Sequence, residues 1–171
     1  MGLLDVVRPA TPALEPIDVA DVVEELVPLL RHAARQRGVQ LETGQRHDGT
    51  RVRGDSGQLQ QILMNLVVNA LEATPAGGKV VIGVGAAERM DRPGVALTVA
   101  DTGAGITPEA LPRIFEAFFT TKSRGQGTGL GLAICRDIAK AHGGEMTVET
   151  RHGGGTTFTL WLPAEAEAPA A

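Results

Sequence analysis

Aliphatic residues recur every three or four positions between residues 55 and 73, where they mark out a broad apolar face. A helix with so wide a face has to be covered by other parts of the chain. Asp55 is a suitable N-cap for this helix, and the run Pro75-Ala-Gly-Gly ends it. The face consists of Leu59, Ile62, Leu63, Leu66, Val67, Ala70 and Leu71. The segment therefore predicts a helix that is packed into the core of the fold.

The other predicted elements are a mixture of helices and β-rich runs. Amphipathic periodicity predicts helices over 18–38 and 130–141, and Thr107-Pro108-Glu109 opens a short helical turn. Residues 117–129 are polar and rich in glycine, which predicts a loop. Alternating and β-branched patterns predict strands near 39–41, 51–53, 79–85, 95–100, 145–150 and 156–162. This mixture predicts an α/β (α+β) sandwich, with a mixed sheet and helices packed on one of its faces.

The two ends of the chain differ in composition from the middle. Residues 1–16 contain three prolines, which break helices, so this stretch is predicted to be a linker. Residues 164–171 (AEAEAPAA) are predicted to be a disordered tail. Residues 17–163 are predicted to form one domain, which suits a chain of 171 residues.

Charge and cysteine content exclude several classes of partner. The net charge is -4 and no long basic run occurs, which argues against nucleic acid or an anionic membrane surface as the main partner. Cys135 is the single cysteine, so neither an intrachain disulfide nor a thiolate-rich metal site can form. No apolar run reaches the about 18 residues of a membrane helix, so we expect no membrane contact by this chain. We expect a cytoplasmic domain, whose parent protein could still be membrane-anchored.

Two segments with polar residues are candidates for ligand binding. Asn65 and Asn69 are four residues apart, so they share a face of the predicted helix. Their amides could simply bond to nearby backbone, but an amide oxygen is also a suitable ligand for Mg²⁺. The segment Asp101-Thr-Gly103-Ala-Gly105-Ile106 directly follows a predicted strand. It could be a plain turn, or a carboxylate acceptor beside glycines that let a ligand come close to the backbone.

Two further segments form loops with a possible phosphate-binding role. Residues 114–122 (IFEAFFTTK) hold three of the four phenylalanines, which predicts a small satellite core that pins a loop. Lys122 could be a solvated surface side chain or could reach a phosphate. Residues 125–132 (GQGTGLGL) lead into an apolar helix, and a glycine-rich loop at a helix N-terminus is suited to bind anions. The same glycine-rich segment could instead be a flexible hinge without a ligand.

Taken together and in this order, the four segments resemble the N box, first glycine box, F box and second glycine box of the GHKL ATPase superfamily. That superfamily includes gyrase, Hsp90, MutL and histidine kinases. The run Gly153-Gly-Gly-Thr156-Thr-Phe158 resembles the closing glycine box, and the resemblance spans about residues 15–163. It implies a Bergerat-type fold that binds ATP together with Mg²⁺.

Within the superfamily, the chain is most similar to the catalytic domains of bacterial sensor histidine kinases. Gyrase, Hsp90 and MutL have a water-activating Glu where this chain has Asn65. The phrases IFEAFFTTK, GTGLGLAI and AHGGEM resemble the nitrogen-regulatory (NtrB-like) group, and residues 3–19 resemble the end of a phosphoacceptor helix plus its linker. The resemblance implies transfer of the γ-phosphoryl group to a histidine on a separate helical dimerisation domain of the parent kinase, with a response regulator acting indirectly. None of the four histidines of this chain has a phosphoacceptor setting.

The resemblance also implies roles for individual residues. Asp101 accepts the adenine amino group, Asn69 binds Mg²⁺, and Asn65 supports the phosphates and the metal. Asn65, Asn69 and Lys122 form the implied catalytic set. Many histidine kinases carry basic residues at the positions of Glu72 and Thr120, which leaves Lys122, alone or with Arg124, as the basic candidate to contact the γ-phosphate. The remaining implied nucleotide contacts are Gly103, Gly105, Ile106, Gly127, Thr128, Gly129, Leu130, Gly131 and Thr156.

Two other functions are compatible with these motifs. One is a protein-serine kinase of the anti-sigma type, although residues 1–17 argue against it because they resemble a histidine kinase linker. The other is a nucleotide-binding module without catalysis, which the intact Asn69, Asp101 and glycine loops argue against.

Overall fold

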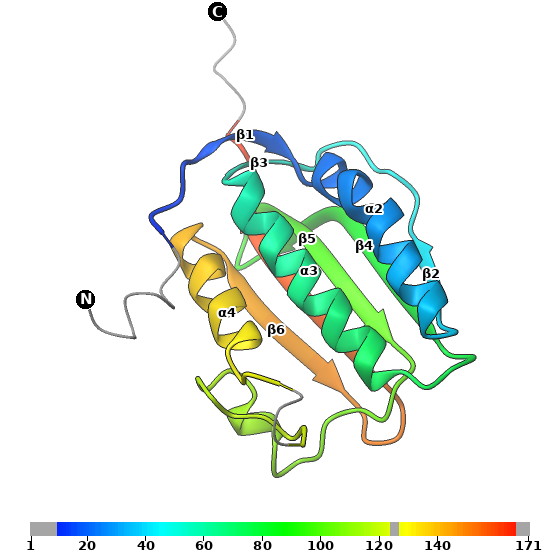
Figure 1. Cartoon of the computed structure of the whole chain (residues 1–171). Helices are drawn as coiled ribbons and strands as arrows, with labels where there is room; N and C mark the ends of the chain where they lie inside the picture. Colours follow the sequence, from blue (N-terminus) through cyan, green and yellow to red (C-terminus); the bar gives the residue numbers. More distant parts are fainter. Residues whose placement is uncertain (1–9, 124–126, 167–171) are drawn as a thin grey trace, which may run out of the picture.

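The main sheet of the protein is mixed, as the sequence predicts. The computed structural model describes residues 10–123 and 127–166. Five strands lie in the order β2-β4-β5-β7-β6, and β2 runs parallel to β4 while the other neighbours are antiparallel (Figure 1). Their bounds are β2 (Gln40–Thr43), β4 (Lys79–Arg89), β5 (Arg92–Asp101), β6 (Glu145–Thr150) and β7 (Thr156–Pro163). Strands β4 and β5 form an antiparallel hairpin, and both are longer than the predicted strands at 79–85 and 95–100.

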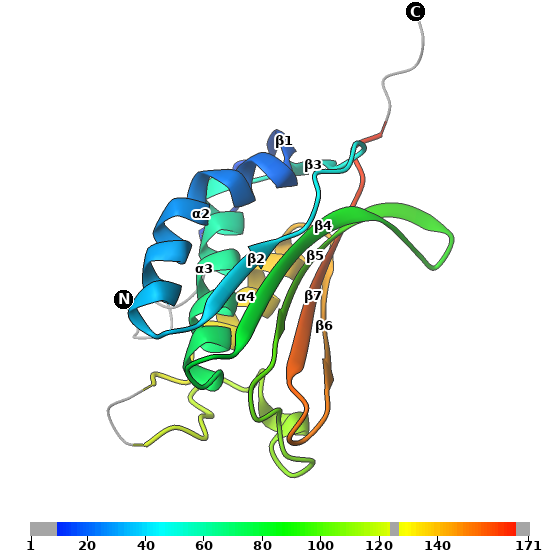
Figure 2. The same ribbon diagram turned by 90° about the vertical axis from the view of Figure 1, so that its right-hand side faces the viewer.

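The helices α2 (Val19–Gln36), α3 (Ser56–Ala73) and α4 (Gly131–Ala141) cover one face of this sheet (Figure 2). The central helix α3 contacts α2 on one side, α4 on the other, and the sheet beneath. This position explains the broad apolar face of α3, because three neighbours cover it. The sequence prediction of an α/β sandwich with helices on one face is confirmed.

The first residue before α3 ties two helices together. Asp55 Oδ1 accepts a hydrogen bond from the backbone N–H of Gln58 at 3.1 Å, which confirms the predicted N-cap. The N–H of Asp55 donates to Nε2 of the buried His142 at 3.0 Å, and His142 Nδ1 lies 2.8 Å from the carbonyl oxygen of Ile138. Because Nε2 accepts, Nδ1 carries the proton and donates. The imidazole therefore joins the start of α3 to the end of α4.

The residues upstream of the domain dock at this same end of α3. The N–H of Ala13 donates to Asp55 Oδ2 at 3.0 Å, and Gln58 Nε2 donates to the carbonyl oxygen of Ala10 at 2.5 Å. Strand β1 (Glu15–Asp18) then pairs antiparallel with β3 (Arg51–Gly54) in a separate two-stranded sheet. The strand thus begins at Glu15, one residue before the predicted end of the linker.

The C-terminal end of the domain also extends past its predicted boundary at Pro163. The N–H of Ala164 donates to the carbonyl oxygen of Pro93 at 3.1 Å, and that of Glu165 donates to the carbonyl oxygen of Arg51 at 2.9 Å. These backbone bonds order two residues whose composition alone predicts disorder. Residues 167–171 of the predicted tail lie outside the described residues. Within 10–123 and 127–166, no helix combines the length and apolarity needed to cross a bilayer.

Candidate nucleotide-binding site

A cleft of about 460 Å³ lies beside the C-terminal half of α3, and residues of all four sequence motifs line it. Its other walls are the segment after β5, the loop around Lys122 and the start of α4. Of the predicted nucleotide contacts, all except Gly103 and Leu130 line this cleft. Residues that the sequence places up to 91 positions apart, from Asn65 to Thr156, therefore meet in one site.

Asp101 stands at the end of β5 with its carboxylate facing the cleft. Its Oδ1 accepts the N–H of Gly103 at 2.8 Å, which fixes the orientation of the side chain. Burial raises the pKa of the Asp101 carboxyl above its ordinary value, and hydrogen bonds from the N–H groups of Gly103 and Thr156 oppose that rise. A half-buried, oriented acceptor of this kind can select a ligand that carries an N–H donor.

The glycines after Asp101 are required by close backbone packing. Gly103 lies under the end of α3, where an added Cβ would stand 2.4 Å from the carbonyl oxygen of Ala73. Gly103 is therefore part of the support of the cleft and not of its lining. Gly105 has φ +74°, and its Cβ would stand 2.1 Å from the carbonyl oxygen of Arg151.

Gly105→Ala is expected to destabilise the nucleotide-free domain by about 2–4 kcal/mol, because both a left-handed backbone and a steric clash oppose the methyl group. Gly77→Ala is the matched control, since Gly77 has φ +88° but nothing within 4 Å of the added Cβ. The control should lose only about 1–2 kcal/mol. Urea unfolding measures both values, and equal losses would show that the contact with Arg151 has no influence.

The described part of the glycine-rich loop brings backbone to the N-terminus of α4. Gly129 has φ +70°, and its carbonyl oxygen accepts the N–H of Phe118 at 2.9 Å. Thr128 Oγ1 accepts the N–H of Leu130 at 3.3 Å, and Leu130 is the N-cap residue of α4 without a side-chain cap of its own. In the part of the chain that the structure describes, the first turn of α4 therefore faces the cleft with N–H groups that a phosphate can accept. Gly125 and Gln126 lie outside the described residues.

The two asparagines of α3 have different surroundings, although both line the cleft. Asn65 Nδ2 lies 3.4 Å from the carbonyl oxygen of Gly131 and 3.7 Å from Cys135 Sγ, so it holds α4 against α3. Asn69 Oδ1 instead lies 3.4 Å from Nζ of Lys122, across the cleft.

The buried Cys135 has a thiol pKa raised to about 12 by burial, in accord with an unreactive side chain.

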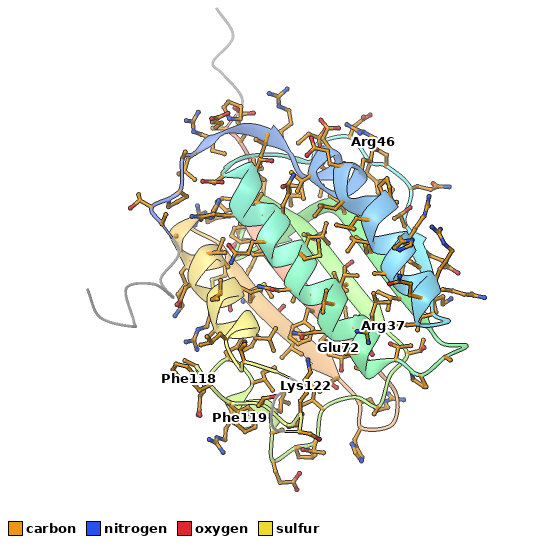
Figure 3. All side chains as sticks on the ribbon, viewed as in Figure 1. Arg37, Arg46, Glu72, Phe118, Phe119 and Lys122 are labelled. Carbon is orange, nitrogen blue, oxygen red and sulfur yellow. The ribbon has the colours of Figure 1, made fainter. Side chains whose placement is uncertain are left out.

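The cation of Lys122 is already engaged in this structure. Its Nζ forms an ion pair with Glu72 Oε2, while Arg37 lies 3.9 Å from Glu72 Oε1 (Figure 3). Lys122 thus reaches from the loop to the last turn of α3. No local pattern predicts this pairing, because 50 residues separate the two partners.

The three clustered phenylalanines do not behave alike. Phe115 packs edge-on against Phe158 at 6.3 Å between ring centroids, and the guanidinium of Arg113 lies 4.4 Å from the centroid of Phe119. Phe118 is 61% exposed and points away from the domain (Figure 3). The predicted satellite core is therefore wrong in detail, because Phe115 and Phe119 extend the main core and Phe118 does not join them.

Thr150 is a supporting residue that the sequence motifs do not include. Its Oγ1 accepts the N–H of Ile106 at 2.9 Å and lies 2.9 Å from Oγ1 of the buried Thr156. It therefore anchors the segment after Asp101 to β6 and β7. The cleft also has an apolar wall that could cover a flat ring, which comprises Ile106, Ala110, Ile114, Phe119, Leu132 and Phe158.

The donors at the cleft fit a metal that is bound together with a phosphate ligand. No group of three His, Cys, Asp or Glu side chains that could hold a metal occurs in 10–123 or 127–166. The amide oxygen of Asn69 is a hard ligand suited to Mg²⁺, which commonly takes most of its remaining ligands from water and nucleotide phosphates. The fold and this cleft define a nucleotide-binding domain of the Bergerat type.

Comparison with known proteins identifies the family. A family model described as "Histidine kinase-, DNA gyrase B-, and HSP90-like ATPase" matches residues 54–166. The catalytic domain of histidine kinase ThkA in a nucleotide-free form is 34% identical with a TM-score of 0.75, and the match covers 88% of this chain and 95% of that one. The chain belongs to this ATPase family, in the branch formed by the catalytic domains of histidine kinases.

Two longer proteins show the same likeness. The sensor histidine kinase ZraS of Escherichia coli is 38% identical over 161 residues, which make up 94% of this chain and 33% of ZraS. Full-length ShkA, solved in complex with AMPPNP, has a TM-score of 0.77 and 35% identity, covering 92% of this chain and 33% of that one. The chain thus spans about one third of the length of the curated relatives it matches.

Proposed function

We propose that this chain binds Mg-ATP in the cleft and donates the γ-phosphoryl group to a histidine on a helical dimerisation domain of its parent sensor kinase. The observation that carries the proposal is the cleft itself. An oriented carboxylate, an apolar wall, two asparagines, a lysine and the start of a helix line one space of nucleotide size. Membership of the ATPase family supports ATP as the ligand.

The adenine end of the cleft is formed around Asp101. Its carboxylate accepts the adenine amino group, Gly105 permits the close approach, and Ile106 lies along the ring, while Gly103 contributes by orienting the carboxylate and packing under the end of α3. Thr156 Oγ1 belongs to the same end, where Thr150 holds it. A carboxylate can only accept, so a base that presents a carbonyl at this point is disfavoured.

The phosphate end is formed by α3, Lys122 and the start of α4. Asn69 would hold Mg²⁺, with Asn65 beside it, and the bound metal would neutralise charge on the phosphates. Backbone N–H groups of the glycine-rich loop donate hydrogen bonds to the phosphate oxygens, and these groups belong to Gly127, Thr128, Gly129, Leu130 and Gly131. Because phosphoryl transfer needs mainly positioning and charge neutralisation, these groups suffice for the role of the protein.

The carboxylates at the cleft are engaged in other contacts and are not placed to activate water. Transfer to a protein acceptor is therefore favoured over hydrolysis. Among the described residues, those that line it are Asp101 and Glu72. Asp101 serves the adenine end, and Glu72 is engaged by two cations. Asn65 stands at the position where related ATPases carry a base, so no free carboxylate of the described site is placed to activate water. The same architecture suits an anti-sigma serine kinase, but no contact among the described residues of the cleft favours that alternative specifically.

The setting of the parent protein follows from the same proposal. The acceptor helices precede residue 17 in the parent, the response regulator takes the phosphoryl group afterwards, and this domain works in the cytoplasm. We retain the NtrB-like group as a prediction supported by residues 114–122 and 141–146.

The chain alone is expected to bind ATP without labelling itself, because its histidines lie outside any acceptor motif. A separate acceptor domain should become labelled, though weakly, because mixing forfeits the high effective concentration of a covalent linker. Radiolabelled ATP is incubated with the chain alone, with the acceptor domain, and with an acceptor whose histidine is replaced. Acid-labile label on the isolated chain would contradict the proposal, and acid-stable label on a partner's serine would favour the anti-sigma alternative.

A further inference from the structure

Glu72 occupies an unusual place for an acidic residue, because it lines a cleft that is built for a polyanion. Its two carboxylate oxygens engage different cations: Oε2 contacts Lys122, and Oε1 faces Arg37 at 3.9 Å (Figure 3). The side chains of Lys122 and Glu72 are 33% and 28% exposed. Solvent therefore screens this pair less than it screens an open surface pair.

The position of Lys122 in this arrangement conflicts with nucleotide binding. Its Nζ lies 3.4 Å from Asn69 Oδ1, the oxygen that the proposed function assigns to the metal. An ammonium group beside that oxygen repels a divalent cation, and it also occupies the oxygen that the cation needs as a ligand. Lys122 therefore has to leave Asn69 before Mg-ATP can occupy the cleft as proposed.

We propose that Glu72 competes with the phosphates of the nucleotide for Lys122, so that ATP binding exchanges the Glu72–Lys122 ion pair for a contact between Lys122 and phosphate. This inference rests on the proposed function. Arg37 remains beside Glu72 after the exchange, so the carboxylate keeps a counter-ion next to the incoming triphosphate. Glu72 is then a residue that sets nucleotide affinity and its dependence on the number of phosphates.

The exchange has a definite sign. Glu72→Gln frees Lys122 and removes a negative charge near the phosphates, so ATP should bind about three- to tenfold more tightly at low salt. AMP should be nearly unaffected, because its single phosphate lies nearest the base. In the Lys122→Gln variant there is no ammonium group for Glu72 and the phosphates to compete for. Adding Glu72→Gln to this variant should therefore tighten ATP binding by less than Glu72→Gln does in the wild-type chain.

Calorimetry with ATP and with AMP, in Mg²⁺, compares the wild-type chain, E72Q, K122Q and the double variant. Glu145→Gln is the matched control, because Glu145 loses the same charge in an ion pair with Arg89 at 2.6 Å and does not line the cleft. Far-UV circular dichroism and melting confirm that each variant is folded. Arg37→Gln provides a second measure with the opposite sign, since it leaves Glu72 less neutralised and should weaken ATP binding about twofold.

Tighter ATP binding by E72Q, absent for AMP and for E145Q and reduced in the double variant, supports the exchange. Unchanged or weaker ATP binding by E72Q, or an equal gain with and without Lys122, overturns it while the proposed function stands. If E72Q fails to fold, unchanged or tighter binding by R37Q overturns the exchange. A wild-type chain that binds no ATP at all overturns the proposed function, and the exchange with it.

Discussion

Replacing Asp101 by Asn is expected to weaken ATP binding at least about tenfold, which corresponds to the loss of one charge-assisted hydrogen bond. An amide can donate as well as accept, so the variant should also discriminate less between ATP and GTP. Calorimetry with both nucleotides measures these effects. If ATP and GTP affinities match those of the wild-type chain, Asp101 is not the residue that recognises the base.

The same substitution should leave the nucleotide-free domain at least as stable as the wild type. Burial raises the pKa of Asp101, so the native state binds its proton more tightly than the unfolded chain. The resulting penalty is fully present above the raised pKa, hence at neutral pH, and it fades as the pH falls through that value toward 3.8. Asn removes the penalty and can still accept the N–H of Gly103.

Asp55→Asn is the matched control, because the pKa of Asp55 moves in the opposite direction. Hydrogen bonds from the N–H groups of Ala13 and Gln58 lower it. Its contribution to stability is therefore present at neutral pH and is lost as the pH falls through the lowered pKa. At pH 7 the melting temperature of D55N should fall while its ATP affinity is kept, the reverse of D101N. A lower melting temperature for D101N at pH 7 would contradict the stability argument.

Asn69→Ala is expected to abolish the part of ATP affinity that depends on Mg²⁺ and to leave the fold intact. Among the described residues, the side-chain partner of Asn69 is Lys122, so its removal costs little in packing or hydrogen bonding. What disappears is the oxygen that we assign to the metal. Calorimetry with and without Mg²⁺ tests the assignment, and an unchanged affinity for Mg-ATP would reject it.

Asn65→Ala separates this effect from a general disturbance of α3. Asn65 reaches Gly131 and Cys135 on α4, so its loss should lower the melting temperature. Because it also loosens the start of α4, ATP binding should weaken both with and without Mg²⁺. The two asparagines lie on the same helix face, yet they should give different results in the same pair of measurements.

The sequence predicts most of the fold because its patterns are local. The N-cap at Asp55, the apolar face of α3 and the alternation of the strands depend only on neighbouring positions. The order of residues at Ala164 and Glu165 is different, because it depends on backbone groups of Pro93 and Arg51 that lie far away in the chain. Composition alone therefore predicts the wrong end for the last ordered segment.

The candidate site likewise has features that local sequence patterns predict and features that depend on contacts between distant residues. Glycine spacing and the pair of asparagines can be read from the sequence, and the structure brings them to one cleft. Thr150 cannot be found like this, since its role comes from the pairing of β6 with β7. The ion pair of Glu72 with Lys122 is also invisible in the sequence, because it depends on how the loop folds back over α3.

The upstream segment is attached at the opposite end of α3 from the phosphate site. Residues 10–13 bond to Asp55 and Gln58, whereas Asn69 and Glu72 lie near the other end of this 18-residue helix. Helix α3 is a continuous element about 27 Å long, and the upstream segment is attached at its N-terminal end. A change of about 10° in the angle at that attachment corresponds to a displacement of about 5 Å at the other end of the helix, where Asn69 and Glu72 lie.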